Sequence, residues 1–224
     1  MAAATTKTSS ALAVVLLCLY AAAFLAMADE DLVAKACKNA TGDQTLARRF
    51  HGPGLTRETC ESTLRSDNRS AAAKHPRDLA LIAMDLLLSA AADLDTKFDG
   101  VLRSSKLDRV TKLNLQFCRV DYGAVVARTV PVCRAKVQEY NPDARSHGQT
   151  SLGDELTSDD YFMCVDKLRN AAADCWLSLF FSTDMYNSGA KKAVWKEVVE
   201  AASHANLAKA MVEQMLGGEV ENEF

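Results

Sequence analysis

Aromatic residues are scarce in this 224-residue chain, at 7% of the sequence, whereas alanine is abundant. Aromatic side chains favour strands and alanine favours helices, so this balance indicates close-packed helices and argues against a β-sandwich or barrel. Apolar residues make up 49% of the chain, which is ordinary for a globular protein, so we do not expect disorder.

Long apolar runs are absent except at the N-terminus, where residues 11–25 follow Lys7 and precede Ala26-Met27-Ala28. A basic residue, an apolar stretch and an A-x-A site form the pattern of a secretory signal peptide. The run is short for a membrane span, and no later segment is long and apolar enough to be one. We therefore expect residues 1–28, with Cys18, to be removed, leaving a secreted chain with no membrane segment.

Catalytic and metal-binding patterns are also missing. No H-E-x-x-H, G-x-S-x-G, P-loop or G-x-G-x-x-G motif is present. The four histidines are scattered along the chain: His51, His75, His147 and His204. Removal of Lys7 leaves 25 of the 26 basic residues and all 29 acidic ones, which gives a net charge of −4. This charge is too mild to indicate a nucleic-acid partner. We expect no catalytic residue, no metal site, no cofactor and no nucleic acid.

Six cysteines remain after the signal peptide: Cys37, Cys60, Cys118, Cys133, Cys164 and Cys175. An even number of cysteines in a secreted chain is typical of a disulfide framework. Cys37 and Cys60 bracket part of residues 29–70, whose middle, Gly52-Pro53-Gly54, is too polar and irregular for one long helix. We interpret this segment as one or two short helices folded into a hairpin that a Cys37–Cys60 bridge would close.

Apolar periodicity in the rest of the chain predicts four amphipathic helices, at about 76–101, 106–140, 158–181 and 190–216. Pro131 is expected to kink the second helix. The expected buried face of that helix is made of Leu107, Val110, Phe117, Cys118, Val125 and Val132. Four such helices with short connections form an all-α, up-and-down antiparallel four-helix bundle. The domain would span residues 29–218, with an acidic tail at 219–224.

The other four cysteines lie two on each of the second and third predicted helices. Because these helices are antiparallel, the pair nearest their connection is Cys133 with Cys164, and the farther pair is Cys118 with Cys175; crossed pairs lie out of disulfide reach. In straight helices the two cysteines are about 22 Å apart on the second helix and about 16 Å apart on the third. A kink at Pro131 is expected to absorb this mismatch; otherwise Cys133 and Cys164 would stay unbridged.

Three segments resemble the plant invertase and pectin methylesterase inhibitor family. They are residues 59–64 (Thr-Cys-Glu-Ser-Thr-Leu), 118–122 (Cys-Arg-Val-Asp-Tyr, with a tyrosine one turn after the cysteine) and 171–175 (Ala-Ala-Ala-Asp-Cys). The resemblance implies Cys37–Cys60 and Cys118–Cys175 bridges and a helical hairpin ahead of a four-helix bundle. It further implies an extracellular protein of the plant cell wall, or apoplast, that binds one enzyme molecule and blocks its substrate cleft. The long Cys37–Cys60 stretch and the additional Cys133 and Cys164 depart from the family pattern.

The resemblance leaves two targets open, pectin methylesterase and acid invertase. Invertase inhibitors of the family tend to carry a Pro-Lys-Phe element before the helix of the last family cysteine, whereas here Pro142 is followed by Asp143 and Ala144. This difference favours pectin methylesterase, with acid invertase as the alternative. The alternative of another class is a secreted helical storage or carrier protein.

Acidic residues around the predicted 141–153 loop are the candidate target-binding residues: Asp143, Asp154, Glu155, Asp159 and Asp160. If they meet basic residues of the enzyme, protonation should weaken the complex as the pH falls towards about 4. Alternatively, the cluster only stabilises the positive N-terminus of its own helix, by about 0.3–1 kcal/mol. Two N-x-[ST] sequons, at Asn39 and Asn68, are expected at the surface as candidate glycan sites.

Overall fold

The computed structural model describes residues 31–41, 54–103, 107–141, 158–181 and 189–217. Within these ranges the chain forms seven α-helices and no strand. The predicted signal peptide, the acidic tail and three of the candidate target-binding residues lie outside the described residues: Asp143, Asp154 and Glu155.

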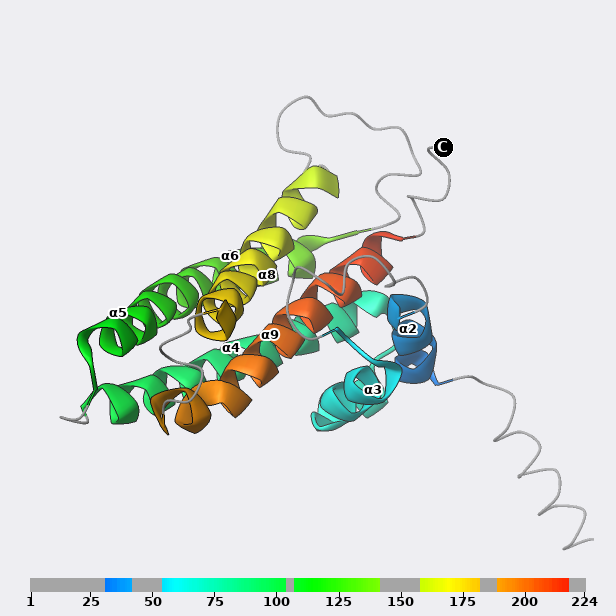
Figure 1. The fold of residues 1–224 in the computed structure, drawn as a ribbon. Coiled ribbons are helices and arrows are strands. Elements are labelled where there is room, and N and C mark those ends of the chain that lie inside the picture. The colour runs from blue at the N-terminus through cyan, green and yellow to red at the C-terminus, as the bar shows by residue number, and fades with distance from the viewer. Residues whose placement is uncertain (1–30, 42–53, 104–106, 142–157, 182–188, 218–224) are drawn as a thin grey trace, which may run out of the picture.

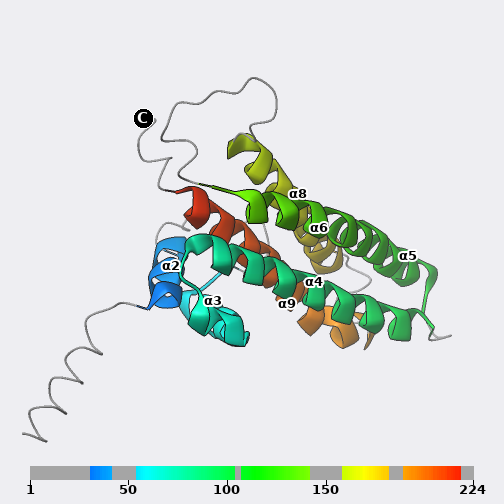
Figure 2. The same ribbon diagram turned by 180° about the vertical axis from the view of Figure 1, so that it is seen from behind.

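Four long helical segments form the bundle shown in Figures 1 and 2. They are α4 (Pro76–Leu102), α5 with α6 (Arg109–Cys118 and Ala124–Glu139), α8 (Ser158–Phe181) and α9 (Gly189–Leu216). Helix α4 packs on α9 and α6, and α8 packs on the same two helices, which closes the bundle. Consecutive segments run in opposite directions (Figure 1), so the predicted up-and-down antiparallel bundle is confirmed.

The N-terminal hairpin consists of α2 (Leu32–Thr41) and α3 (Arg57–Arg65), followed by a 3₁₀ turn at Asn68–Ala72. The Thr56 hydroxyl caps α3 by accepting a hydrogen bond from the Thr59 N–H at 3.2 Å. The hairpin packs beside one end of the bundle against α4 and α9 (Figure 1). Its buried residues continue the bundle core: Val33, Ala36, Cys37, Cys60 and Leu64.

Helix α4 starts where the sequence predicts. Pro76 occupies the first turn, and the Asp78 carboxylate accepts hydrogen bonds from the backbone N–H groups of Lys74 and His75 at 3.0 and 3.1 Å. The apolar spacing of the sequence predicts Leu86 and Ala90 on the buried face of this helix, but Leu87 and Ala91 are buried there and Leu86 and Ala90 only partly.

The second bundle segment differs from the single helix that the sequence predicts. Helix α6 continues through Pro131, and the irregularity is a π-helical turn at Arg119–Gly123, between α5 and α6. The wider turn rotates the chain by less than the 100° per residue of an α-helix, which returns later residues to the core side. Cys118 and Cys133 therefore both face α8.

The predicted buried face of this segment is wrong at three of its six positions, whereas Cys118 is buried and Leu107 and Val125 pack partly buried against the core. Val110, Phe117 and Val132 are 46%, 51% and 56% exposed. The residues that face the core are Thr111, Leu115, Cys118, Tyr122, Val126, Val130, Cys133 and Val137. The error arose because the segment carries apolar residues on two sides, and periodicity alone does not say which side the bundle covers.

Candidate functional site

The end of the bundle at which α6 and α8 are joined contains the described part of the candidate site. Three residues of α6 and its C-terminal cap, each about one turn after the last, contact α8. Cys133 is bonded to Cys164 with their Cα atoms 5.8 Å apart, Lys136 Nζ lies 3.6 Å from Asp160 Oδ1, and the Tyr140 and Tyr161 rings meet edge to face with centroids 5.7 Å apart. These contacts fix the two helix ends that flank residues 142–157.

The start of α4 is tied to the same end of the bundle. Arg77 Nη1 donates a hydrogen bond to the Tyr140 carbonyl at 3.2 Å, which satisfies one of the carbonyls left unpaired where α6 ends. The start of α4, the end of α6 and the start of α8 are therefore held together at the end of the bundle next to residues 142–157.

Two of the five candidate target-binding residues lie in described structure. Asp159 and Asp160 are in the first turn of α8, after Ser158. The Asp160 side chain is 42% exposed and pairs with Lys136, so part of its charge is neutralised within the chain. This pair is not predictable from the sequence, because a contact between residues 24 positions apart depends on the register of two helices.

The disulfide framework contains the three pairs that the sequence predicts. The Cα atoms are 5.6 Å apart in Cys37–Cys60, 4.7 Å in Cys118–Cys175 and 5.8 Å in Cys133–Cys164. Tyr122, the tyrosine one turn after Cys118, is buried beside this framework, and burial raises the pKa of its phenol above the ordinary value. Both candidate glycan sites, Asn39 and Asn68, are exposed.

An ionic cluster ties the hairpin to the bundle. Asp85 on α4 accepts hydrogen bonds from Arg134 of α6 and from Arg69 of the 3₁₀ turn, both at 2.8 Å. Partial burial raises the pKa of Asp85, but the hydrogen bonds from the two guanidinium groups outweigh it and hold the pKa below its ordinary value. Hydrogen bonds from Arg69 likewise lower the pKa of Asp67. The cluster therefore joins α4, α6 and the 3₁₀ turn through ion pairs.

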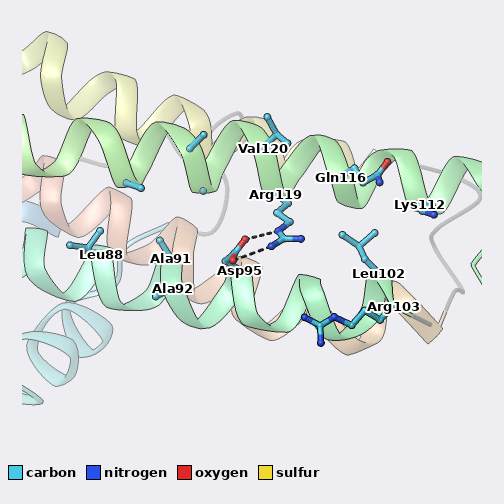
Figure 3. A pocket seen from close by; sticks show the side chains of 13 residues that line it. Leu88, Ala91, Ala92, Asp95, Leu102, Arg103, Lys112, Gln116, Arg119 and Val120 are labelled. Carbon is cyan, nitrogen blue, oxygen red and sulfur yellow. Dashed lines mark hydrogen bonds and ion pairs between the residues drawn. The ribbon is translucent and has the colours of Figure 1, made fainter. Parts of the chain in front are cut away.

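A groove of about 990 Å³ lies between α4 and the segment made of α5, the π-helical turn and α6 (Figure 3). Arg119 crosses it and donates to Asp95 Oδ1 at 2.7 Å and to Asp99 Oδ1 at 2.8 Å. In Figure 3 small apolar residues lie to one side of the Arg119–Asp95 pair, and Leu102, Arg103, Lys112 and Gln116 lie to the other. No serine, cysteine or histidine lines the groove, and its one acidic lining residue, Asp95, is paired with Arg119.

No group of three or more His, Cys, Asp or Glu residues that could hold a metal ion occurs in the described part of the chain. None of the described helices is long and apolar enough to cross a membrane.

The described residues define an all-helical, disulfide-linked bundle with an N-terminal helical hairpin. A family model described as plant invertase/pectin methylesterase inhibitor matches residues 31–211, and the chain belongs to this family. The match starts at the hairpin and ends in α9, so it includes both structural units. Members of the family are inhibitors of pectin methylesterase or invertase, and they are not catalysts. No curated protein matches the chain.

Proposed function

We propose that the protein is a secreted inhibitor that binds pectin methylesterase in the plant cell wall and blocks its substrate cleft, one inhibitor per enzyme. The observation that carries this proposal is the family match over residues 31–211. Acid invertase is the second target that the same match allows.

Inhibition by binding needs a preorganised surface rather than a reactive group, because a rigid surface loses little conformational entropy when the complex forms. The end of the bundle at α6 and α8 suits this role. The Cys133–Cys164 bridge, the Lys136–Asp160 ion pair and the Tyr140–Tyr161 contact hold its helices in place. Acidic residues in and beside the 142–157 segment would then meet basic groups of the enzyme.

The choice of pectin methylesterase rests on the sequence after α6. Pro142 is followed by Asp143 and Ala144 in place of the Pro-Lys-Phe element that invertase inhibitors of the family tend to carry. A carrier function has less support, since the groove between α4 and α5–α6 is open and the Arg119 ion pairs cross it. A carrier of apolar ligands would need a mostly apolar, largely enclosed pocket.

The test measures inhibition of pectin methylesterase and of acid invertase separately, with the purified mature protein and with an Asp159→Asn/Asp160→Asn variant. We expect the wild-type protein to inhibit pectin methylesterase, and the variant to inhibit it more weakly at neutral pH. The variant should also lose the weakening towards about pH 4 that carboxylate protonation causes. Asp174→Asn, an exposed aspartate near the other end of α8, is the matched control.

Two results would count against this proposal in different ways. Equal inhibition by the wild-type protein and the double variant at every pH would remove Asp159 and Asp160 from the interface but leave the target intact. Failure of the folded wild-type protein to inhibit either enzyme would make the inhibitor assignment wrong for this chain.

A further inference from the structure

An exposed apolar stripe runs along the side of α5 that faces away from the bundle core. It consists of Val110, Leu113 and Phe117 of α5 together with Val120 in the first part of the π-helical turn that follows, and is called the outer stripe below. These side chains are 46%, 55%, 51% and 64% exposed. In both ribbon views α5 lies at the outer edge of the bundle, with no other helix beyond it (Figures 1 and 2).

The outer stripe has the spacing of a coiled-coil seam. Its members are separated by three, four and three residues, which are the a and d positions of a heptad pattern. The core face of α5, made of Thr111, Leu115 and Cys118, occupies positions on the opposite side of the helix. Helix α5 therefore presents one apolar side to its own bundle and a second one to the outside.

The outer stripe also has the same residue spacing when it is followed from either end. Its spacing is symmetric about Leu115, with a valine at each end and a larger side chain at each inner position. If two copies of α5 pair antiparallel about a twofold axis near Leu115, Val110 meets Val120 of the second copy and Leu113 meets Phe117. A self-complementary patch of this kind is what a twofold-symmetric dimer interface requires.

The polar residues beside the outer stripe are compatible with this pairing. The flanking positions nearest the twofold axis carry the uncharged side chains of Asn114 and Gln116. In the paired helices, Lys112 would lie at about the same height as Arg119 of the second copy, which brings two positive charges together. The charge of Arg119 is already neutralised by its ion pairs with Asp95 and Asp99. No like charges therefore oppose each other without compensation at the centre of the interface.

We propose that the outer stripe is a self-association surface that pairs α5 antiparallel with α5 of a second copy. The bundle already holds α5 in its helical form, so pairing does not have to fold it. One and a half heptads bury much less than the about 800 Å² per partner of a standard interface, so the dimer is weak and forms only at high protein concentration. This surface is separate from the α6–α8 end, and the proposal does not depend on which enzyme the protein inhibits.

Sedimentation equilibrium over a wide range of protein concentration tests the association. We expect a reversible monomer–dimer equilibrium, weakened about tenfold or more by Phe117→Glu, because a charge then enters the centre of the seam. The matched control is Met163→Glu on α8, which changes another exposed apolar side chain, 74% exposed, and should leave the equilibrium unchanged. A wild-type protein that stays monomeric throughout, or equal weakening by both variants, would overturn the proposal.

The orientation has a separate test in a short thiol-reactive cross-linker applied to the folded protein. Antiparallel pairing places Gln116 beside Gln116 of the second copy, so Gln116→Cys should give a cross-linked dimer and the exposed Ala135→Cys on α6 should not. Cross-linking of both cysteine variants to the same extent would contradict the pairing. Loss of enzyme inhibition by Phe117→Glu, at concentrations where the protein is monomeric, would also contradict it. The outer stripe would then be the surface that binds the enzyme.

Discussion

Removal of the Cys133–Cys164 bridge should destabilise the protein mainly through the unfolded chain. The two cysteines are 31 positions apart, and for a loop of this length the chain-entropy relation gives about 3.7 kcal/mol at 25 °C. In a Cys133→Ala/Cys164→Ala variant, the Lys136–Asp160 ion pair and the Tyr140–Tyr161 contact still align α6 with α8. Alanine is preferable to serine here, because Cys133 is buried and a serine hydroxyl would need a hydrogen-bond partner.

Urea unfolding followed by circular dichroism measures this effect. We expect the free energy of unfolding to fall by about 3–4 kcal/mol, and for a chain of this size each kcal/mol corresponds to about 2–4 °C in Tm. The dependence of that free energy on urea should become steeper, since the unfolded chain without the cross-link exposes more surface. A loss below about 1 kcal/mol, or a loss without a steeper slope, would refute the argument that the bridge acts by restricting the unfolded chain.

Three further substitutions test the packing and the ion pairs by the same unfolding assay. Asp85→Asn should cost about 1 kcal/mol at pH 7 after allowance for solvent screening. The pKa of Asp85 is lowered in the folded state, so its stabilising contribution is present above the unfolded pKa of about 4 and is lost as the pH falls through the folded pKa. The loss of stability caused by Asp85→Asn should therefore shrink at low pH. A loss that grows below about pH 4 would contradict the role of the cluster. Ser70→Ala should cost about 0.5–1.5 kcal/mol, because the buried Ser70 hydroxyl donates to the Leu64 carbonyl at 2.5 Å, whereas the exposed Ser66→Ala should cost less. Ala205→Leu should cost about 1–3 kcal/mol by overpacking a fully buried position of α9, and a neutral result would mean that the core is looser there.

The bundle could be predicted from the sequence because its helices have clear ends and simple apolar faces. Helix α8 spans Ser158–Phe181, the predicted range, and α4 extends one residue beyond its predicted end. Capping signals such as Asp78 and the stop at Gly217 are local, so they can be read without knowledge of the tertiary structure.

The segment from α5 to α6 could not be predicted in the same way. It carries two apolar sides, and the buried face predicted from the sequence combines residues of both. The side that is buried is fixed by Cys118, which must reach Cys175 on α8, and by the π-helical turn that keeps Cys133 in line with Cys164. A π-helical turn depends on the packing around it and has no simple local signature in the sequence.

The ion pairs of the candidate site were also beyond reach of the sequence alone. Lys136 and Asp160, or Asp85 and Arg134, come together only once the register of their helices is fixed. The cysteine pairs were accessible because antiparallel helices with two cysteines each allow one nested arrangement within disulfide reach.

Calorimetric titration of the purified mature protein into pectin methylesterase, with residual enzyme activity measured on the same samples, tests the proposed function most directly. We expect a saturable complex at one inhibitor per enzyme, with activity lost in proportion to the complex formed. Under the same conditions acid invertase should give weaker binding or none. Absence of binding to pectin methylesterase by folded protein, or binding that leaves the enzyme fully active on pectin, would contradict the assignment.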